Sequence, residues 1–185
     1  MAKGTLAPTT DDAANALLND NPLALLIGML LDQQIPIEWA FMGPYRLAER
    51  LDGDLDAAVL AALTEEQIIE LFVTKPALHR YPAVMARRTR ELCEYLVGAH
   101  DNDPGSLWRR ARSADRVWDR LIALPGFGEE KAMITMAVLA KRFGVTPKGW
   151  EALAGPFADD QPRTVADVDG PEAMAEVRAW KKAQK

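Results

Sequence analysis

The chain contains very little cysteine or histidine. Its one cysteine, Cys93, cannot form an internal disulfide and cannot alone hold zinc or an iron–sulfur cluster, which need about three or four protein ligands. We expect Cys93 to pack in the core rather than act as a reactive thiol, because no second cysteine or paired histidine accompanies it. His79 and His100 have no partner carboxylate at motif spacing, so we expect both to be structural or solvated.

Long apolar runs are also missing. No stretch reaches about 18 uncharged apolar residues, and Met1 to Asp12 is polar and acidic rather than basic and then apolar. We therefore expect neither a membrane span nor a signal peptide, and we expect a cytoplasmic location.

Strand-forming residues are scarce. The 185 residues include 30 Ala and 22 Leu, against 10 Val, 7 Ile and 9 Thr. This excess of helix formers over β-branched residues predicts an all-α fold. With 49% hydrophobic residues, the chain is long enough to bury one good core or two small ones.

Charge is unevenly distributed along the chain. The net charge is −5, but residues 1–74 carry −9, residues 75–148 carry +6 and residues 149–185 carry −2. The overall acidity argues against a nucleic-acid partner, whereas the basic middle third favours phosphate contacts, because arginine suits forked hydrogen bonding to phosphate. A solvated helix face is the alternative. The arginines of this block are Arg80, Arg87, Arg88, Arg90, Arg109, Arg110, Arg112, Arg116 and Arg120.

Local patterns predict a series of short helices. The segment 23–34 is apolar on nearly every side, so we expect it to be the central helix. Thr64 and Gln67 have the form of a capping box, and Gly98 is the expected end of a long basic helix. The expected helices span Asp12 to about Asn19, then 23–34, 36–50, 54–62, 65–73, 80–98, 106–111, 114–123, 129–143 and 171–184.

A hairpin of Leu124, Pro125, Gly126, Phe127 and Gly128 joins two of these helices. Proline fixes one dihedral angle, and the glycines can adopt positive φ and leave the main chain bare. Amide groups of such a turn point outward at the start of a helix and bind an anion. A DNA phosphate fits this arrangement, and the contact does not depend on the DNA sequence. A tight turn between packed helices is the alternative.

The segment from Asp115 to Val145 resembles the helix-hairpin-helix of the base-excision DNA glycosylase superfamily that includes endonuclease III and the alkyladenine glycosylases. Leu25 to Gln34 is similar to that family's buried helix, which ends in a glutamine. The two segments follow the family's order, and the resemblance covers about residues 20–145. It implies a two-lobed all-α fold. One lobe is a helical barrel, 36–143, with the helix-hairpin-helix at 115–143, and the other combines 1–35 with 144–185.

The resemblance implies a monomeric enzyme that hydrolyses the N-glycosidic bond of a damaged or mispaired base in double-stranded DNA. Such an enzyme must extrude the base and fill the gap that it leaves. Gln34 is the candidate plug, with a helix-capping amide as the alternative. Trp39, Tyr45 and Phe127 are candidate walls for the extruded base, with core packing as the alternative.

The family's catalytic aspartate has no direct counterpart here. Counting some twenty residues beyond the hairpin, where the aspartate would stabilise positive charge on the sugar, reaches only Glu151. Asp159 and Asp160 lie about ten residues further on, and a loop insertion of that length costs little free energy. The string from Pro156 to Asp160 resembles the alkyladenine branch, so Asp160 is the first candidate, followed by Asp159 and Glu151.

Strand-cutting relatives use a lysine just after the hairpin to form a Schiff base. Glu130 occupies the aligned position, and Lys131 is turned about 100° around the helix. We therefore expect no lyase activity and interpret Lys131 as a phosphate contact, with a solvated lysine as the alternative. Relatives often carry a monovalent cation at the hairpin, which would offset repulsion between a phosphate and the neighbouring glutamates. We expect no other cofactor and no iron–sulfur cluster.

Two other functions remain open. The missing aspartate favours a non-catalytic protein that binds DNA damage or DNA structure on the same scaffold. The negative overall charge favours a helical protein-interaction module without a DNA role.

Overall fold

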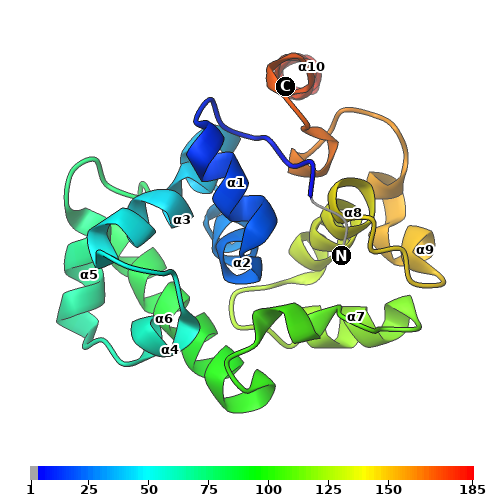
Figure 1. Cartoon of the computed structure of the whole chain (residues 1–185). Coiled ribbons are helices and arrows are strands. Elements are labelled where there is room, and N and C mark those ends of the chain that lie inside the picture. Colours follow the sequence, from blue (N-terminus) through cyan, green and yellow to red (C-terminus); the bar gives the residue numbers. More distant parts are fainter. Residues whose placement is uncertain (1–3) are drawn as a thin grey trace.

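The computed structural model describes residues 4–185, and every regular element in this range is helical (Figure 1). The expected all-α fold is confirmed for these residues. The α-helices are α1 (Asp12–Asp20), α2 (Pro22–Leu31), α3 (Ile37–Leu51), α4 (Ala57–Ala61), α5 (Glu65–Val73), α6 (Pro82–His100), α7 (Ala114–Ile122), α8 (Glu129–Phe143), α9 (Trp150–Ala154) and α10 (Pro171–Ala183). Three short 3₁₀ helices are η1 (Pro104–Leu107), η2 (Gly155–Ala158) and η3 (Val165–Asp167).

Helix α2 lies at the centre of the core, as its all-round apolar pattern predicts. Every residue from Leu23 to Leu31 is buried. Gly28 allows α3 to pack closely, because a Cβ at this position would lie 2.5 Å from the ring of Phe41. The helix ends at Leu31, three residues earlier than expected, and the chain turns before Pro36. Proline disfavours helical geometry in the residue before it, which contributes to this early end.

Expectations about the other helices have mixed outcomes. The helix expected at 106–111 is wrong, because this part of the chain forms the 3₁₀ helix η1 followed by turns. The capping box of α5 is confirmed, because the Thr64 hydroxyl accepts from the amide of Gln67 and the Gln67 side chain accepts from the amide of Thr64. The prediction that Gly98 ends α6 is wrong, since the helix continues to His100. Asp101 adopts the left-handed conformation instead, which short polar side chains tolerate.

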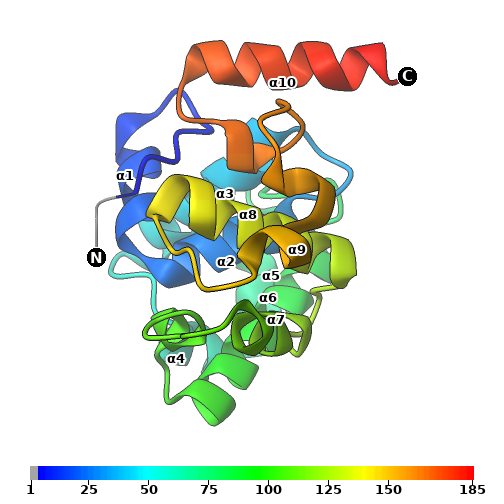
Figure 2. The ribbon, with the colours of Figure 1, turned by 90° about the vertical axis from the view of Figure 1, so that its right-hand side faces the viewer.

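The N-terminal segment lies beside the C-terminal half of the chain. The amide of Thr5 donates to the carbonyl of Arg142 at 2.9 Å, and the amide of Ala7 donates to that of Val168 at 3.2 Å. Helix α8, expected in the barrel lobe, packs mainly on α9 and η3 from the C-terminal segment, and less on α7 and η2. Figure 2 shows α8 between the N-terminal segment and α9, with α10 above them. Residues 1–3 of the predicted second lobe lie outside the described range.

Cys93 packs in the core as predicted. Its side chain is fully buried, and burial raises the pKa of the thiol to about 12. In residues 4–185 no single helix is long and apolar enough to cross a membrane; α1 and α2 pass that test only as a pair, bent by 111° at the break between them.

The packing at Gly28 gives a direct stability test. We expect Gly28→Ala to destabilise the fold by about 1–3 kcal/mol, because its methyl group would overlap the ring of Phe41. Gly98→Ala is the matched control within α6. Its Cβ meets nothing within 4 Å, so the change should stabilise the fold by up to about 1 kcal/mol through helix propensity. Urea unfolding measures both, and equal effects of the two variants would contradict the packing of α2 on α3.

Candidate nucleic-acid interface and active site

The hairpin between α7 and α8 buries its two large apolar side chains and exposes its glycines. Leu124 and Phe127 are buried, whereas Gly126 and Gly128 are exposed. The amide of Phe127 donates to the carbonyl of Leu124 at 3.1 Å and closes the turn. Gly126 has a φ of 84°, and a Cβ there would lie 2.5 Å from the Leu30 side chain. This position therefore needs glycine both for its backbone conformation and for its close approach to α2.

Main-chain amides at the hairpin are left without partners inside the protein. No described residue accepts a hydrogen bond from the amides of Gly126, Gly128 or Glu129. Gly128 precedes the first residue of α8 and offers no side chain to cap the helix. Unpaired amides at the start of a helix favour an anion. The carboxylates of Glu129 and Glu130 lie in the same first turn and oppose that preference.

A cavity of about 890 Å³ lies next to the hairpin. Its walls come from the end of α2 and the turn after it, the hairpin glycines, the first turn of α8, η2 and α10. Gln34, Gly126 and Gly128 all line it. The structure thus brings the expected plug and the expected phosphate-binding turn to one cavity, although they are about ninety residues apart in the sequence.

Gln34 is exposed and has a φ of 58°, a left-handed conformation that a residue with a side chain rarely adopts. Its side chain makes no hydrogen bond with any described residue, so it does not cap α2. Lys131 performs that task, because its Nζ donates to the carbonyls of Met29 at 2.6 Å and Leu30 at 3.1 Å. The Gln34 amide is consequently free to contact a ligand.

His79 fixes the turn that presents Gln34. Its ring is buried, and its Nε2 lies 3.0 Å from the Gln33 carbonyl. The amide of Tyr81 donates to Nδ1, so Nε2 carries the proton and donates to Gln33. Burial lowers the pKa of His79, which keeps the ring neutral and in this arrangement. The expectation of a structural role is confirmed for this histidine.

Asp32 and Lys131 give the cavity its distinctive electrostatics. Burial raises the pKa of the Asp32 carboxyl, while the nearby ammonium groups of Lys181 and Lys131 act in the opposite direction. Burial lowers the pKa of Lys131 to about 8, and Asp32 partly opposes that shift. Two groups with perturbed pKa values in one cavity are typical of functional sites. Asp32 is not among the residues predicted from the sequence. Its position at the end of an apolar helix, two residues before Gln34, could have indicated that it lies in the site.

The predicted catalytic aspartates lie elsewhere. Asp159 and Asp160 are exposed and do not line the cavity. The carboxylate of Asp159 accepts from Arg163 at 2.7 Å and from the amide of Gln161 at 3.0 Å, which holds the loop after η2. Glu151 is exposed on α9 and also lies outside the cavity.

The predicted aromatic walls also lie outside this cavity. Trp39 lines a separate hollow of about 420 Å³, and its Nε1 donates to the carbonyl of Ala77 at 2.9 Å. Tyr45 is half-buried near Glu49, whose carboxylate raises the pKa of the phenol. The aromatic side chains that do line the cavity are Phe157 and Trp180. Trp180 also lies against Arg163, whose Cζ is 5.7 Å from the ring centroid.

Within residues 4–185, no group of three His, Cys, Asp or Glu side chains is arranged to hold a metal ion. The monovalent cation at the hairpin stays a prediction. Comparisons with protein-family models, with curated proteins and with solved structures find no match to this chain.

The burial of Lys131 predicts how stability depends on pH. Lys131 keeps its proton up to about pH 10.5 in the unfolded chain but only up to about pH 8 in the folded protein. Between these values the unfolded state therefore binds more protons. The free energy of unfolding of the wild type should therefore rise with pH in this window, by about 3 kcal/mol more than that of Lys131→Met. Lys148→Met, at an exposed position, is the control and should keep the wild-type slope. Parallel unfolding free energies of wild type and Lys131→Met across this range would contradict the burial of the ammonium.

Proposed function

We propose that the protein is a monofunctional DNA glycosylase that hydrolyses the N-glycosidic bond of a damaged or mispaired base in duplex DNA. The observation that carries this proposal is the meeting of three features at one cavity of about 890 Å³. These are the unpaired hairpin amides, the free side chain of Gln34 and the half-buried carboxylate of Asp32. The volume of this cavity is within the usual range of about 300–1,000 Å³ for small-molecule sites and leaves room for a nucleobase.

In this proposal the hairpin holds the DNA backbone. A phosphate accepts hydrogen bonds from the amides of Gly126 and Gly128, a contact that holds DNA whatever its sequence. A cation at the hairpin would reduce repulsion by Glu129 and Glu130. Gln34 fills the space in the base stack, and its lack of an internal hydrogen-bond partner makes the amide available to the opposing base.

The extruded base enters the cavity between the hairpin and α10. Phe157 and Trp180 offer aromatic faces for it. These two residues take the role predicted from the sequence for Trp39, Tyr45 and Phe127, none of which lines the cavity.

Asp32 is the proposed catalytic carboxylate in place of Asp160 and Asp159. As the glycosidic bond breaks, positive charge develops on the sugar, and a carboxylate in a cavity partly shielded from water stabilises that charge more strongly than an exposed one. The raised pKa of Asp32 implies that activity falls on the acid side at a higher pH than an ordinary aspartate would cause.

One observation favours the non-catalytic alternative. Both predicted catalytic aspartates lie outside the cavity, and Asp159 is already bound to Arg163. A protein that binds damaged DNA without cutting it would keep the hairpin and Gln34 and need no carboxylate at the reacting sugar.

The proposed glycosylase activity is tested by measuring base release from duplexes that contain uracil, alkylated, oxidised or mismatched bases. We expect release of a base by the wild type and a loss of about 100-fold in rate for Asp32→Asn, because one charge-stabilising group is removed. Asp160→Asn and the exposed-loop variant Asp54→Asn should stay close to the wild-type rate. Abasic-duplex binding with no base release would favour the non-catalytic binder. Absence of duplex binding even at low salt would contradict both.

The prediction that the protein has no lyase activity is tested separately. Nζ of Lys131 donates to two carbonyls of α2, so a sugar aldehyde would have to displace those contacts before Nζ could attack it. We therefore expect borohydride to trap no covalent adduct between the protein and an abasic-site duplex. An adduct that disappears in Lys131→Met would overturn this prediction.

A further inference from the structure

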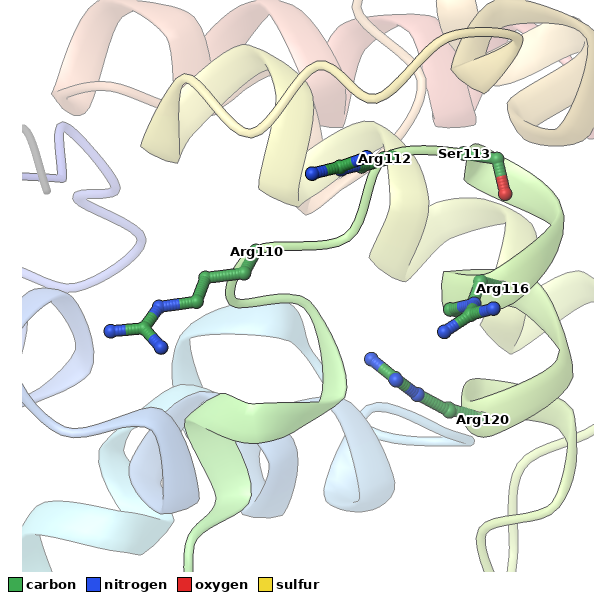
Figure 3. A pocket seen from close by; sticks show the side chains of 5 residues that line it. All are labelled: Arg110, Arg112, Ser113, Arg116 and Arg120. Atoms are coloured by element: carbon green, nitrogen blue, oxygen red, sulfur yellow. The ribbon is translucent and has the colours of Figure 1, made fainter.

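A second charged cavity lies along α7 and the segment that precedes it. It has a volume of about 360 Å³ and is lined by Arg110, Arg112, Ser113, Arg116 and Arg120 (Figure 3). Four of its five lining residues are therefore arginine, and none is acidic. It shares no lining residue with the cavity beside the hairpin.

The arginines of this pocket are largely unpaired. Arg110, Arg112 and Arg116 make no ion pair and no side-chain hydrogen bond with any described residue. Other exposed arginines do form ion pairs, as Arg87 does with Glu65 and Arg109 with Asp103. Asp115 and Asp119 also lie on α7, but neither carboxylate lines the pocket.

The spacing of these residues places like charges side by side. Arg116 and Arg120 are four residues apart on α7, and like charges at this spacing on a helix repel one another. In Figure 3, Arg116 and Arg120 direct their guanidinium groups from α7 into the same space. Arg112 lies above them in this view, and Arg110 extends from the loop on the far side with its guanidinium group directed away from them. An anion in this space would turn the repulsion into attraction.

Two side chains of the pocket are placed to bind a ligand. One Nη of Arg120 donates to the carbonyls of Ser106 at 3.1 Å and Leu107 at 3.2 Å, which fixes the guanidinium in place. Ser113 is the N-cap of α7, but its hydroxyl makes no capping bond. The hydroxyl is therefore available to a ligand at the start of the helix.

We propose that this arginine pocket binds a phosphate group. Guanidinium groups present planar, forked donors that match the oxygens of phosphate, and several of them around one small cavity favour an anion with more than one negative charge. The phosphate belongs either to a free polyphosphate compound or to the backbone of DNA. The site does not rest on the glycosylase proposal, because it shares no residue with the cavity beside the hairpin.

Calorimetric titration with sodium tripolyphosphate at low salt tests the proposal. We expect saturable binding of one tripolyphosphate per protein, and a loss of affinity of about tenfold or more in Arg112→Gln/Arg116→Gln. Arg80→Gln/Arg87→Gln is the control, because it removes the same charge from exposed arginines outside the pocket and should keep affinity within about twofold of the wild type. Thermal melting by circular dichroism checks that both variants are folded.

Two results would overturn the proposal: absence of saturable binding to the wild type, or the same loss of affinity in both double variants. A competition arm identifies the source of the phosphate. If an undamaged duplex displaces tripolyphosphate from the pocket, the ligand is the DNA backbone. If both bind at once, the ligand is a free phosphate compound.

Discussion

The candidate site depends on the contact between the end of α2 and the start of α8. Lys131 donates to the carbonyls of Met29 and Leu30, and Gly126 approaches the side chain of Leu30 more closely than any residue with a Cβ could. These contacts hold the hairpin against α2. As a result, the bare amides of the hairpin and the turn that carries Gln34 border the same cavity.

The burial of α2 explains why a lysine is found at this point. An apolar helix that is buried on all sides cannot expose its last carbonyls to water, so a donor from the protein must satisfy them. Lys131 provides that donor, and the loss of water around its ammonium lowers its pKa to about 8. The same residue thus completes the fold and contributes a positive charge opposite Asp32.

The sequence predicts the local features of this molecule well. The capping box at Thr64, the ends of α8 and the all-round burial of α2 follow from residue patterns within one or two helical turns. The end of α2 differs from the prediction, and the turn after it is held by contacts with distant residues, such as the bond of His79 to Gln33.

The candidate site is predicted only in part for the same reason. Gln34 and the hairpin glycines carry recognisable patterns, whereas Asp32, Phe157 and Trp180 reach the cavity only because α2, η2 and α10 pack around it. Trp39 and Tyr45 have suitable chemistry, but the packing of α3 places them elsewhere. Of the arginine pocket, the sequence shows only the four-residue spacing of Arg116 and Arg120 on one helix.

The bare amides of the hairpin are proposed to hold a DNA phosphate, and a proton–nitrogen NMR titration of the labelled protein with an abasic-site duplex tests this contact. If they do, the backbone amide signals of Gly126 and Gly128 and the side-chain amide signal of Gln34 will be among those that shift most. Binding of the duplex with these three signals unchanged would contradict it.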